Sequence, residues 1–233
     1  MKILVIIPAY NEQENILNTI HDIEINCPGM DYVVINDCSR DHTEQILTDH
    51  NIRHITLPCN LGIGGGVQTG YRYARENGYD IAIQFDGDGQ HEAKYLNDLV
   101  ALIETGQADI VVGSRYIIKT GFQSTGLRRA GISFLSHLIR LLCGVRVLDV
   151  TSGMRAVNRR FIEEYAMEYA QDYPEPEAIV LAAIKGARIK EVPVEMRERQ
   201  GGSSSISPLR SVYYMIKVSL ALILVRFSSQ KEA

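Results

Sequence analysis

The chain has 233 residues, of which 45% are hydrophobic and 22% are charged. This length and balance exclude a disulfide-stapled miniprotein and a disordered chain, and they fit one α/β domain. The net charge of −4 and the lack of an aromatic–basic recognition motif argue against a nucleic-acid role.

The first half of the chain alternates between two patterns. Short β-branched runs bounded by turn residues predict buried strands, at residues 3–7, 32–35, 80–85 and 109–112. Helical stretches lie between them, near residues 13–25, 42–50, 66–77 and 92–104. This alternation predicts an α/β fold, a mostly parallel sheet flanked by helices.

The second half is less regular. Residues 129–143 predict a helix rich in Ile, Leu and Phe. Another helix is expected to begin within Pro174–Glu177, because proline suits a first turn and acidic side chains favour the positive end of a helix. Residues 188–194 predict a strand, and Pro193 favours an edge position for it.

The chain is expected to end in one more helix, from Pro208 to about Phe227, after a glycine- and serine-rich loop at residues 201–205. We therefore divide the chain into a domain of residues 1–207 and an amphipathic C-terminal helix in residues 208–233.

The cysteines predict no metal or disulfide chemistry. Cys27, Cys38, Cys59 and Cys143 are far apart and form no CxxC pair, which is typical of reduced thiols. No signal-peptide pattern follows Met1, since the first residues are typical of a core strand, and we expect no cleaved leader.

Polar side chains follow three of the predicted strands. They are Asn11 and Glu12 after the first, residues 37–39 after the second and residues 86–88 after the third. Ligands of parallel sheets bind at the carboxyl ends of the strands. We expect the three clusters to share one rim.

The strongest local signal is the run Asp86-Gly87-Asp88-Gly89-Gln90. Two carboxylates one residue apart, with glycines beside them, can turn toward one divalent cation, and Gln90 can add a neutral oxygen. Mg²⁺ and Mn²⁺ accept carboxylate ligands and share substrate phosphates. The alternative is a solvated Asp-Gly turn of the kind common in hairpins. His91 directly follows, and as a lone histidine it is expected to pack in the interior or to support a ligand-binding neighbour rather than to bind a ligand itself.

Two glycine-containing segments are candidates for phosphate binding. Residues 62–66 (GIGGG) are expected to open a helix, where backbone N–H groups can approach a phosphate, or else to form a flexible turn. Arg199, followed by glycines and the serines of residues 203–205, can bind a diphosphate, or else is part of an ordinary polar loop.

Taken together, these motifs resemble family 2 glycosyltransferases with the GT-A fold. The resemblance covers roughly residues 3 to 206 and is greatest to polyprenyl-phosphate sugar synthases such as dolichyl-phosphate mannose synthase. Its carriers lie in the family's order: residues 8–12 (PAYNE), 36–41 (NDCSRD), 60–64 (NLGIG), 85–91 (FDGDGQH), 113–116 (GSRY), 149–153 (DVTSG) and 191–194 (EVPV), with Arg199, Gly202 and Ser204.

The resemblance implies a role for each matching residue. The nucleotide site would comprise Pro8, Ala9, Tyr10, Glu12, Asp37, Gly62, Asp86 and Gly87. The metal would be held by Asp86, Asp88 and Gln90, and the catalytic residues would be Asp86, Asp88 and Arg199. Phosphate and acceptor contacts would come from Arg115, Arg199, Ser203, Ser204 and Ser205. The chain departs from dolichyl-phosphate mannose synthases at Ser205, where they carry lysine, and in the Tyr173–Glu177 segment, where only Glu177 matches.

The implied activity is inverting transfer of a sugar from a nucleotide-diphosphate donor, with UDP preferred over GDP, to a polyprenyl phosphate, with Mg²⁺ or Mn²⁺ as cofactor. Such a reaction would feed cell-surface polysaccharide or glycan synthesis. One alternative is transfer to a sugar hydroxyl of a growing glycan, which needs a general base; Asp149, Glu175 and Glu177 are the candidates. Another is a non-catalytic nucleotide-binding module.

Charge is unevenly distributed in a way that suits an anionic partner. Two blocks are acidic: residues 1–112 contain six basic and seventeen acidic side chains, and residues 161–184 contain six acidic and no basic ones. Two blocks are basic: residues 113–160 contain nine basic side chains and one acidic one, and residues 185–233 contain nine basic and four acidic ones. The alternative is chance clustering on solvated faces.

A polyprenyl-phosphate acceptor requires contact with a membrane. The longest uncharged apolar stretch near the C-terminus, residues 218–225, is too short to span a bilayer, which takes about 20 residues. Residues 128–146 interleave arginines with Phe and Leu, which suits an anionic lipid surface or, alternatively, a core helix with an arginine-rich exposed face. We expect a cytoplasmic protein attached peripherally to the inner face of the membrane, with a small membrane protein as one candidate partner and a homo-oligomer through the C-terminal helix as another.

Overall fold

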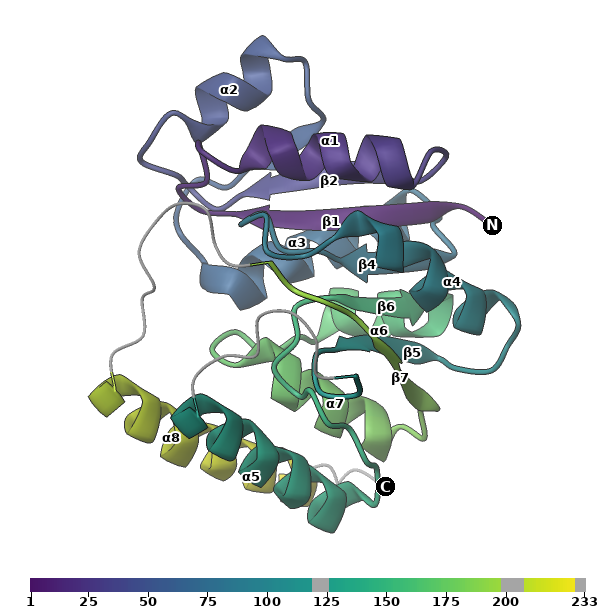
Figure 1. The fold of residues 1–233 in the computed structure, drawn as a ribbon, viewed down its shortest axis with the longest axis vertical. Coiled ribbons are helices and arrows are strands. Elements are labelled where there is room, and N and C mark those ends of the chain that lie inside the picture. The colour runs from purple at the N-terminus through teal and green to yellow at the C-terminus, as the bar shows by residue number, and fades with distance from the viewer. Residues whose placement is uncertain (119–125, 198–207, 229–233) are drawn as a thin grey trace.

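In the described part of the chain, seven strands form one mixed sheet at the centre of the structure (Figure 1). The computed structural model describes residues 1–118, 126–197 and 208–228. The strand order is β3-β2-β1-β4-β6-β5-β7. The strands are β1 (Ile3–Ala9), β2 (Asp31–Asn36), β3 (His54–Thr56), β4 (Ile81–Gln84), β5 (Ile110–Ser114), β6 (Arg155–Asn158) and β7 (Ile189–Pro193).

One strand of this sheet runs against the others. β1 pairs in parallel with β2 and β4, β2 with β3, and β5 with β7. β6 lies between β4 and β5 and is antiparallel to both. The carboxyl ends of β1, β2 and β4 therefore meet at one edge of the sheet, where ligands of such sheets bind.

The sheet is buried on both faces, and its central strand β1 is apolar in every position. In β1, Val5 and Ile7 face one core cluster, and Leu4 and Ile6 face the other. Side chains of α1, α2 and α4 fill the first cluster, and those of α3, α6 and α7 fill the second. The helices are α1 (Ile16–Asn26), α2 (Thr43–Asp49), α3 (Gly62–Glu76), α4 (Leu96–Glu104, after a 3-10 turn at Ala93–Tyr95), α5 (Gly126–Cys143), α6 (Arg159–Met167), α7 (Pro174–Ile184) and α8 (Pro208–Ser228).

A third apolar cluster lies away from the sheet. The helices α5 and α8 pack side by side, with α7 between them and the sheet (Figure 1). Val218 and Leu222 of α8 are fully buried there, against residues of α5 and α7. None of the helices in the described ranges is long and apolar enough to cross a membrane.

The expected α/β fold is confirmed, and so are the strands and helices expected in the first half. Pro193 ends β7, which is an edge strand, as predicted. The terminal helix also lies where it was expected, at Pro208–Ser228, and the division of the chain at residue 207 stays a prediction. The sequence prediction missed β3, β6 and α6. These elements are short, at three, four and nine residues, and in β6 a charged residue interrupts the apolar pattern.

Candidate active site

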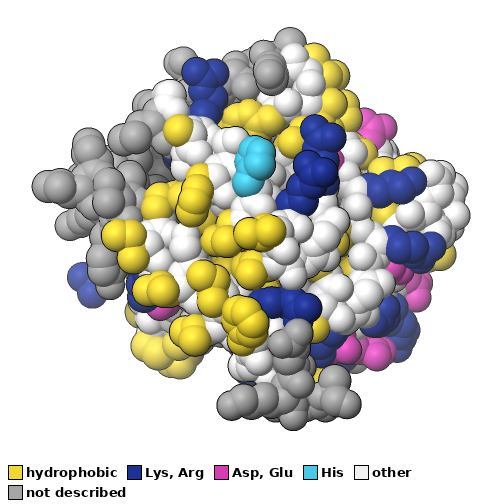
Figure 2. All heavy atoms as spheres, turned by 90° about the horizontal axis from the view of Figure 1, so that it is seen from below, with side chains coloured by type: hydrophobic (Ala, Val, Ile, Leu, Met, Phe, Trp, Pro, Cys, Tyr) yellow, Lys and Arg dark blue, Asp and Glu magenta, His cyan; other side chains and the backbone are white. Residues whose placement is uncertain are grey.

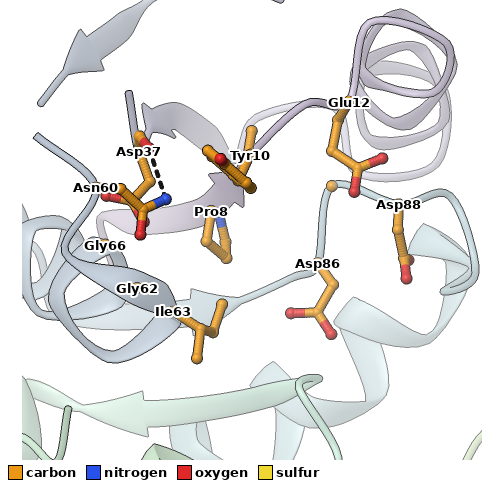
Figure 3. Close-up of a pocket in the computed structure, with 12 residues that line it drawn as sticks. Pro8, Tyr10, Glu12, Asp37, Asn60, Gly62, Ile63, Gly66, Asp86 and Asp88 are labelled. Carbon is orange, nitrogen blue, oxygen red and sulfur yellow. Dashed lines mark hydrogen bonds between the residues drawn. The ribbon is translucent and has the colours of Figure 1, made fainter. Parts of the chain in front are cut away.

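A cavity of about 370 Å³ opens at the carboxyl ends of β1, β2 and β4 (Figure 3). Its lining residues come from the ends of these strands and from the start of α3. They are Pro8, Ala9, Tyr10, Glu12, Asp37, Asn60, Gly62, Ile63, Gly66, Asp86, Gly87 and Asp88. The three polar clusters that follow the first, second and third predicted strands therefore do share one rim, as expected.

Backbone geometry holds the loops of this rim together. Asn11, after β1, and Cys38, after β2, both have a positive φ of 57°, a backbone conformation that residues other than glycine rarely adopt. The Asn11 N–H donates to Ser39 Oγ at 2.9 Å, and the N–H of Arg40 donates to Asn11 Oδ1 at 2.8 Å. Two strained residues at one rim, each fixed by its neighbour, are typical of a binding site whose shape is set before the ligand arrives.

Asp37 connects the end of β2 to the start of α3. Its Oδ1 accepts a hydrogen bond from the N–H of Leu61 at 2.7 Å, and its carbonyl oxygen accepts one from Asn60 Nδ2 at 3.1 Å. Asp37 is only 4% exposed, so the carboxylate is a fixed part of the cavity wall (Figure 3).

The glycines of residues 62–66 have two different roles. Gly62, with φ of 75°, lines the cavity at the first residue of α3, where backbone N–H groups are available to an anion, and Gly66 lines it one turn further along. Gly64 does not line the cavity. A Cβ at this position would lie 2.2 Å from the carbonyl oxygen of Ala170, so Gly64 lets α3 pack against that loop. The segment is the first turn of a helix, and the alternative of a flexible turn was wrong.

Acidic side chains gather at the other side of the cavity. Figure 3 shows the carboxylates of Glu12, Asp86 and Asp88 there, opposite Asp37 and Asn60. Glu12 Oε2 accepts from Asn15 Nδ2 at 2.9 Å, and Asp88 Oδ1 accepts from the N–H of Gln90 at 3.0 Å. Carboxylates brought this close repel one another unless cations or hydrogen-bond donors compensate them.

Asp86 is held by side chains from the interior of the protein. His91 Nε2 lies 3.5 Å from its Oδ2, and Gln84 Nε2 lies 3.5 Å from its Oδ1. Burial raises the pKa of Asp86, but the hydrogen bond and charge of His91, the Gln84 amide and the charge of Arg155 together outweigh it and lower this pKa. Asp86 is thus held ionised. His91 is 3% exposed and supports Asp86 from the interior, in agreement with the packing role expected for it.

The donor set fits a hard divalent cation that shares its coordination with a ligand. In the ranges described, no group of three or more His, Cys, Asp and Glu side chains forms a metal site made by the protein alone. Mg²⁺ and Mn²⁺ commonly bind through one or two carboxylates plus substrate phosphates. Asp86 and Asp88 supply two carboxylates beside an open cavity. Gln90, the third predicted ligand, is outside the cavity lining, and its Nε2 donates to the carbonyl oxygen of Arg197 at 3.4 Å.

Arg115 lies at the end of β5, in a buried ion pair. Its Nε and Nη2 donate to the two carboxylate oxygens of Asp149, each at 2.6 Å. Asp149 is fully buried, and its own N–H donates to Glu191 at 2.9 Å. Because Arg115 is only 5% exposed, its predicted contact with a phosphate stays a prediction.

A second cavity, of about 510 Å³, lies beside Arg115 and has a basic lining. Its positive charge comes from Arg129 and Arg146, and His137 adds ring nitrogens. Hydroxyl groups come from Ser133 and Ser136. Tyr116, Ile117, Ile132 and Leu148 complete the lining. Burial lowers the pKa of Arg115, but the hydrogen bond and charge of Asp149 outweigh it and raise this pKa, with smaller contributions from Tyr116 of the second cavity and Asp86 of the first. The Arg115 guanidinium lies 5.4 Å from the centre of the Tyr116 ring.

The remaining predicted residues have mixed outcomes. Arg199, Ser203, Ser204 and Ser205 lie outside the described residues. Asn60, Ile63 and Gly66 also line the first cavity. Ile63 and Gly66 belong to the candidate phosphate-binding segment of residues 62–66, whereas Asn60 was recognised only as part of the 60–64 motif. The basic second cavity was signalled only by the positive charge of residues 113–160.

Comparison with known proteins gives consistent relatives. Residues 4–166 match the family model described as glycosyl transferase family 2. The chain is 31% identical to the undecaprenyl-phosphate mannosyltransferase of Micrococcus luteus, over 89% of this chain and 88% of that protein. It is 30% identical to the polyprenol monophosphomannose synthase of Mycolicibacterium smegmatis, over 93% and 85%. It is also 30% identical to a UDP-N-acetylglucosamine–dolichyl-phosphate N-acetylglucosaminyltransferase of Methanococcus voltae, over 83% and 84%.

Among solved structures, the chain resembles glucosyl-3-phosphoglycerate synthase from Mycobacterium tuberculosis in complex with Mn²⁺, UDP-glucose and glycerol 3-phosphate. The TM-score is 0.71 at 20% identity, and the match covers 97% of this chain and 79% of the other. At this identity the likeness shows a shared fold, the GT-A fold that the sequence motifs implied.

Proposed function

The chain belongs to glycosyl transferase family 2, and on that premise we propose that it transfers a sugar from a nucleotide-diphosphate donor to a polyprenyl phosphate. The observation that carries this proposal is the contrast between the two cavities. One has acidic side chains suited to a metal-bound diphosphate, and the other has basic side chains suited to a phosphate acceptor.

We assign the donor to the first cavity. The nucleoside would lie against Pro8, Ala9, Tyr10 and Asp37, and the diphosphate would run toward Asp86 and Asp88. A UDP-sugar is the donor we favour. The solved structure of the glucosyl-3-phosphoglycerate synthase holds UDP-glucose, and the Methanococcus voltae relative is a UDP-N-acetylglucosamine enzyme.

We assign a divalent cation, Mg²⁺ or Mn²⁺, to Asp86 and Asp88. When bound, the cation neutralises the charge that develops on the leaving diphosphate. The solved structure of the synthase with UDP-glucose also contains Mn²⁺. Gln84 and His91 keep Asp86 in place and ionised, so the carboxylate is ready for a cation without rearrangement.

The chemical step then needs little from the protein besides orientation. An oxygen of the acceptor phosphate attacks the anomeric carbon from the side opposite the leaving group. A new C–O bond forms, the bond from carbon to the diphosphate oxygen breaks, and the configuration inverts. A phosphate oxygen is already ionised near neutral pH, so no general base has to remove a proton.

We assign the acceptor phosphate to the second cavity. Arg129 and Arg146 can compensate its charge, and the Ser133 and Ser136 side chains lie in the same wall. Ser136 Oγ donates to the carbonyl oxygen of Val147 and so fixes the loop that follows α5.

The polyprenyl chain of such an acceptor lies in a bilayer, and the face formed by α5 and α8 suits contact with it. Figure 2 views the molecule from this side, where hydrophobic side chains gather and Lys and Arg lie among and around them. Phe134 and Leu141 of α5 are 55% and 83% exposed, and Leu224 of α8 is 68% exposed. Apolar side chains ringed by arginines bind anionic membrane surfaces. We propose peripheral attachment to the cytoplasmic face through this surface; a small membrane protein or a second copy would use the same surface.

The donor and the acceptor can be tested together. Purified protein would be incubated with UDP- and GDP-sugars, a short-chain polyprenyl phosphate and Mn²⁺ or Mg²⁺, and products would be read by mass spectrometry. We expect a polyprenyl-phosphate sugar from a UDP-sugar, and no product when EDTA is present. Transfer to a glycan hydroxyl, with none to the lipid phosphate, would contradict the proposal.

Membrane attachment has its own test. Wild-type protein is expected to float with vesicles that contain anionic lipid, and Phe134→Ser/Leu141→Ser is expected to float less. Met167→Ser, at an equally exposed apolar residue on α6, is the matched control and should float as the wild type does. Protein that stays at the bottom of the gradient with anionic vesicles would contradict attachment by lipid alone.

One observation favours the alternative of a hydroxyl acceptor. Of the three candidate bases, Asp149 is paired with Arg115. Burial, with the charge of Asp172, raises the pKa of Glu177 although Lys217 of α8 opposes the shift, but Glu177 is not placed near Asp86. Glu175 lies near Asp86, and burial, with the charge of Asp86, raises its pKa although Arg155 opposes the shift. A carboxylate with a raised pKa suits a general base. Loss of about 10²-fold or more in turnover in Glu175→Gln, with donor binding intact, would favour this alternative.

A further inference from the structure

A fully buried arginine lies behind the proposed metal site. Arg155, on the antiparallel strand β6, is the largest of the side chains that are completely inaccessible to solvent. In the sheet it is paired with Gln84 of β4, two residues before Asp86. Burying a permanent charge is expensive, and an apolar side chain would fill this space at lower free energy. The arginine therefore needs an explanation beyond packing.

The guanidinium bonds to backbone on both sides of Asp86. Its Nη2 donates to the carbonyl oxygen of Ser152 at 3.1 Å, and its Nη1 donates to the carbonyl oxygen of Glu175 at 3.0 Å. Its Nε has no hydrogen-bond partner among the described residues. The fork of the guanidinium thus joins the segment before β6 to the first turn of α7, a geometry that lysine cannot reproduce.

The residue that follows Ser152 forms the surface on which the Asp86 carboxylate rests. A Cβ at Gly153 would lie 2.1 Å from Asp86 Oδ2 and 2.5 Å from its Cγ. The carboxylate therefore lies directly over the backbone of Gly153. Because Arg155 holds the carbonyl group of Ser152, it also determines where this backbone lies.

The other bond of Arg155 reaches Asp86 from a second direction. It fixes the backbone of Glu175, whose Oε1 is 3.5 Å from Gln84 Nε2, and the same Nε2 is 3.5 Å from Asp86 Oδ1. The hydroxyl of Tyr169 donates to Gln84 Oε1 at 3.3 Å and holds the amide in this orientation. The positive charge of Arg155 also compensates both nearby carboxylates.

We propose that Arg155 is a positioning residue for the metal site, which sets the place of the Asp86 carboxylate through Ser152–Gly153 and through Glu175–Gln84. This proposal rests on the proposed function in one respect, namely that Asp86 holds the cation. Partners of metal ligands commonly affect metal affinity by 10- to 100-fold when they are replaced.

The test measures Mn²⁺ binding by electron paramagnetic resonance, with and without UDP, rather than turnover alone. Arg155→Met keeps much of the volume and removes the charge and the fork, and it is expected to weaken Mn²⁺ binding about 10-fold or more. Arg155→Lys keeps the charge but can reach only one carbonyl group, and it should give an intermediate affinity. Gly153→Ala should weaken binding by a similar factor with Arg155 intact.

A matched control separates positioning from general loss of stability. Val157 lies two residues along β6, is fully buried, and belongs to the core cluster of α3 and α6. Val157→Ala is expected to lower the melting temperature and to leave Mn²⁺ affinity unchanged. Arg155→Met and Gly153→Ala are expected to be non-additive in the double variant, since both displace the same carboxylate.

Several results would overturn the proposal. They are wild-type Mn²⁺ affinity in folded Arg155→Met, or equal losses of affinity in Arg155→Met and Val157→Ala. If Arg155→Met does not fold, the proposal is overturned when Arg155→Lys and Gly153→Ala both bind Mn²⁺ with wild-type affinity. If the wild type itself binds no Mn²⁺, the proposed function fails instead. Crystal structures then decide the inference, since the Asp86 carboxylate should leave Gly153 in Arg155→Lys and stay there in Val157→Ala.

Discussion

The two halves of the molecule build their parts of the active site by different means. The first half, from β1 to α4, surrounds the first cavity, which we propose binds the donor, with loops at the ends of parallel strands. The second half, from β5 to α8, contributes charged groups that are buried in or beside the sheet, such as Arg115 with Asp149, and Arg155. The first half offers polar groups from strand ends to a ligand, and buried charges of the second half, such as Arg155, lie behind them.

The difference extends to how each half stores unfavourable free energy. Within the described residues, all the non-glycine positions with positive φ are in the first half, at Asn11, Cys38 and Asn51. The fully buried ionic side chains, Asp149 and Arg155, are both in the second half. Backbone strain and buried charge both cost free energy, and both cluster at sites of function. Asp86 belongs to the rim of the first half, and its carboxylate lies against Gly153 and is influenced by the charge of Arg155, both in the second half.

The largest expected effect tests whether the rim of the first half carries the chemistry. Asp88→Asn should lower turnover by about 10²–10³-fold, because it removes one of two carboxylates from the cation that stabilises the leaving diphosphate. Stability should change little, since Asp88 lies at the cavity surface. Turnover at saturating Mn²⁺ and the melting temperature would be measured together.

The same strand offers a matched control for that variant. Asp80 directly precedes β4, at the opposite end from Asp88, and its Oδ2 accepts from the N–H of Lys2 at 2.8 Å. Asp80→Asn should keep wild-type turnover. Equal turnover in the two variants would show that the carboxyl edge of β4 has no special role in catalysis.

The sequence predicted the first half well because its signals are local. Each predicted strand contains an apolar run, and each rim cluster directly follows its strand, as Asp86 and Asp88 follow β4. The three-residue β3, with His54 and Thr56, has no such run and was missed. The parallel topology then places these clusters together without further information. Asn60 and Ile63 were recognised within a motif, but only the structure shows that they line the cavity.

The second half was predicted less well because its important contacts join residues far apart in the chain. In β6, four residues long, Arg155 breaks the apolar pattern that would identify a buried strand. Its partner Ser152 is only three residues away, but Glu175 is reached only after α6 and α7 fold back on the sheet. The pairing of Arg115 with Asp149, 34 residues later, likewise cannot be predicted from the periodicity of hydrophobic residues in the sequence.

The second prediction tests buried charge in the second half. Asp149→Asn should destabilise the protein by about 3–5 kcal/mol, because it leaves the Arg115 guanidinium buried without its counter-charge. The measurement is urea unfolding at neutral pH. Glu163→Gln is the comparison, since the pair of Arg159 and Glu163 is exposed on α6 and should contribute about 0.5 kcal/mol or less. Similar losses in both variants would mean that burial does not set the strength of the Arg115–Asp149 pair.

The smallest expected effect tests backbone strain in the first half. Cys38 has a φ of 57°, and this left-handed conformation costs a side chain about 1 kcal/mol that glycine does not lose. Glycine also gains about 0.5–1 kcal/mol of entropy in the unfolded chain, which opposes the benefit. Cys38→Gly should therefore leave the free energy of unfolding nearly unchanged.

The control is the same substitution at the exposed Cys59, which does not have a positive φ. Cys59→Gly should lower the free energy of unfolding by about 0.5–1 kcal/mol. Urea unfolding of the two variants isolates the strain, because the unfolded-state term is common to both. Equal losses would mean that Cys38 stores no strain, and that hydrogen bonds alone hold the rim in shape.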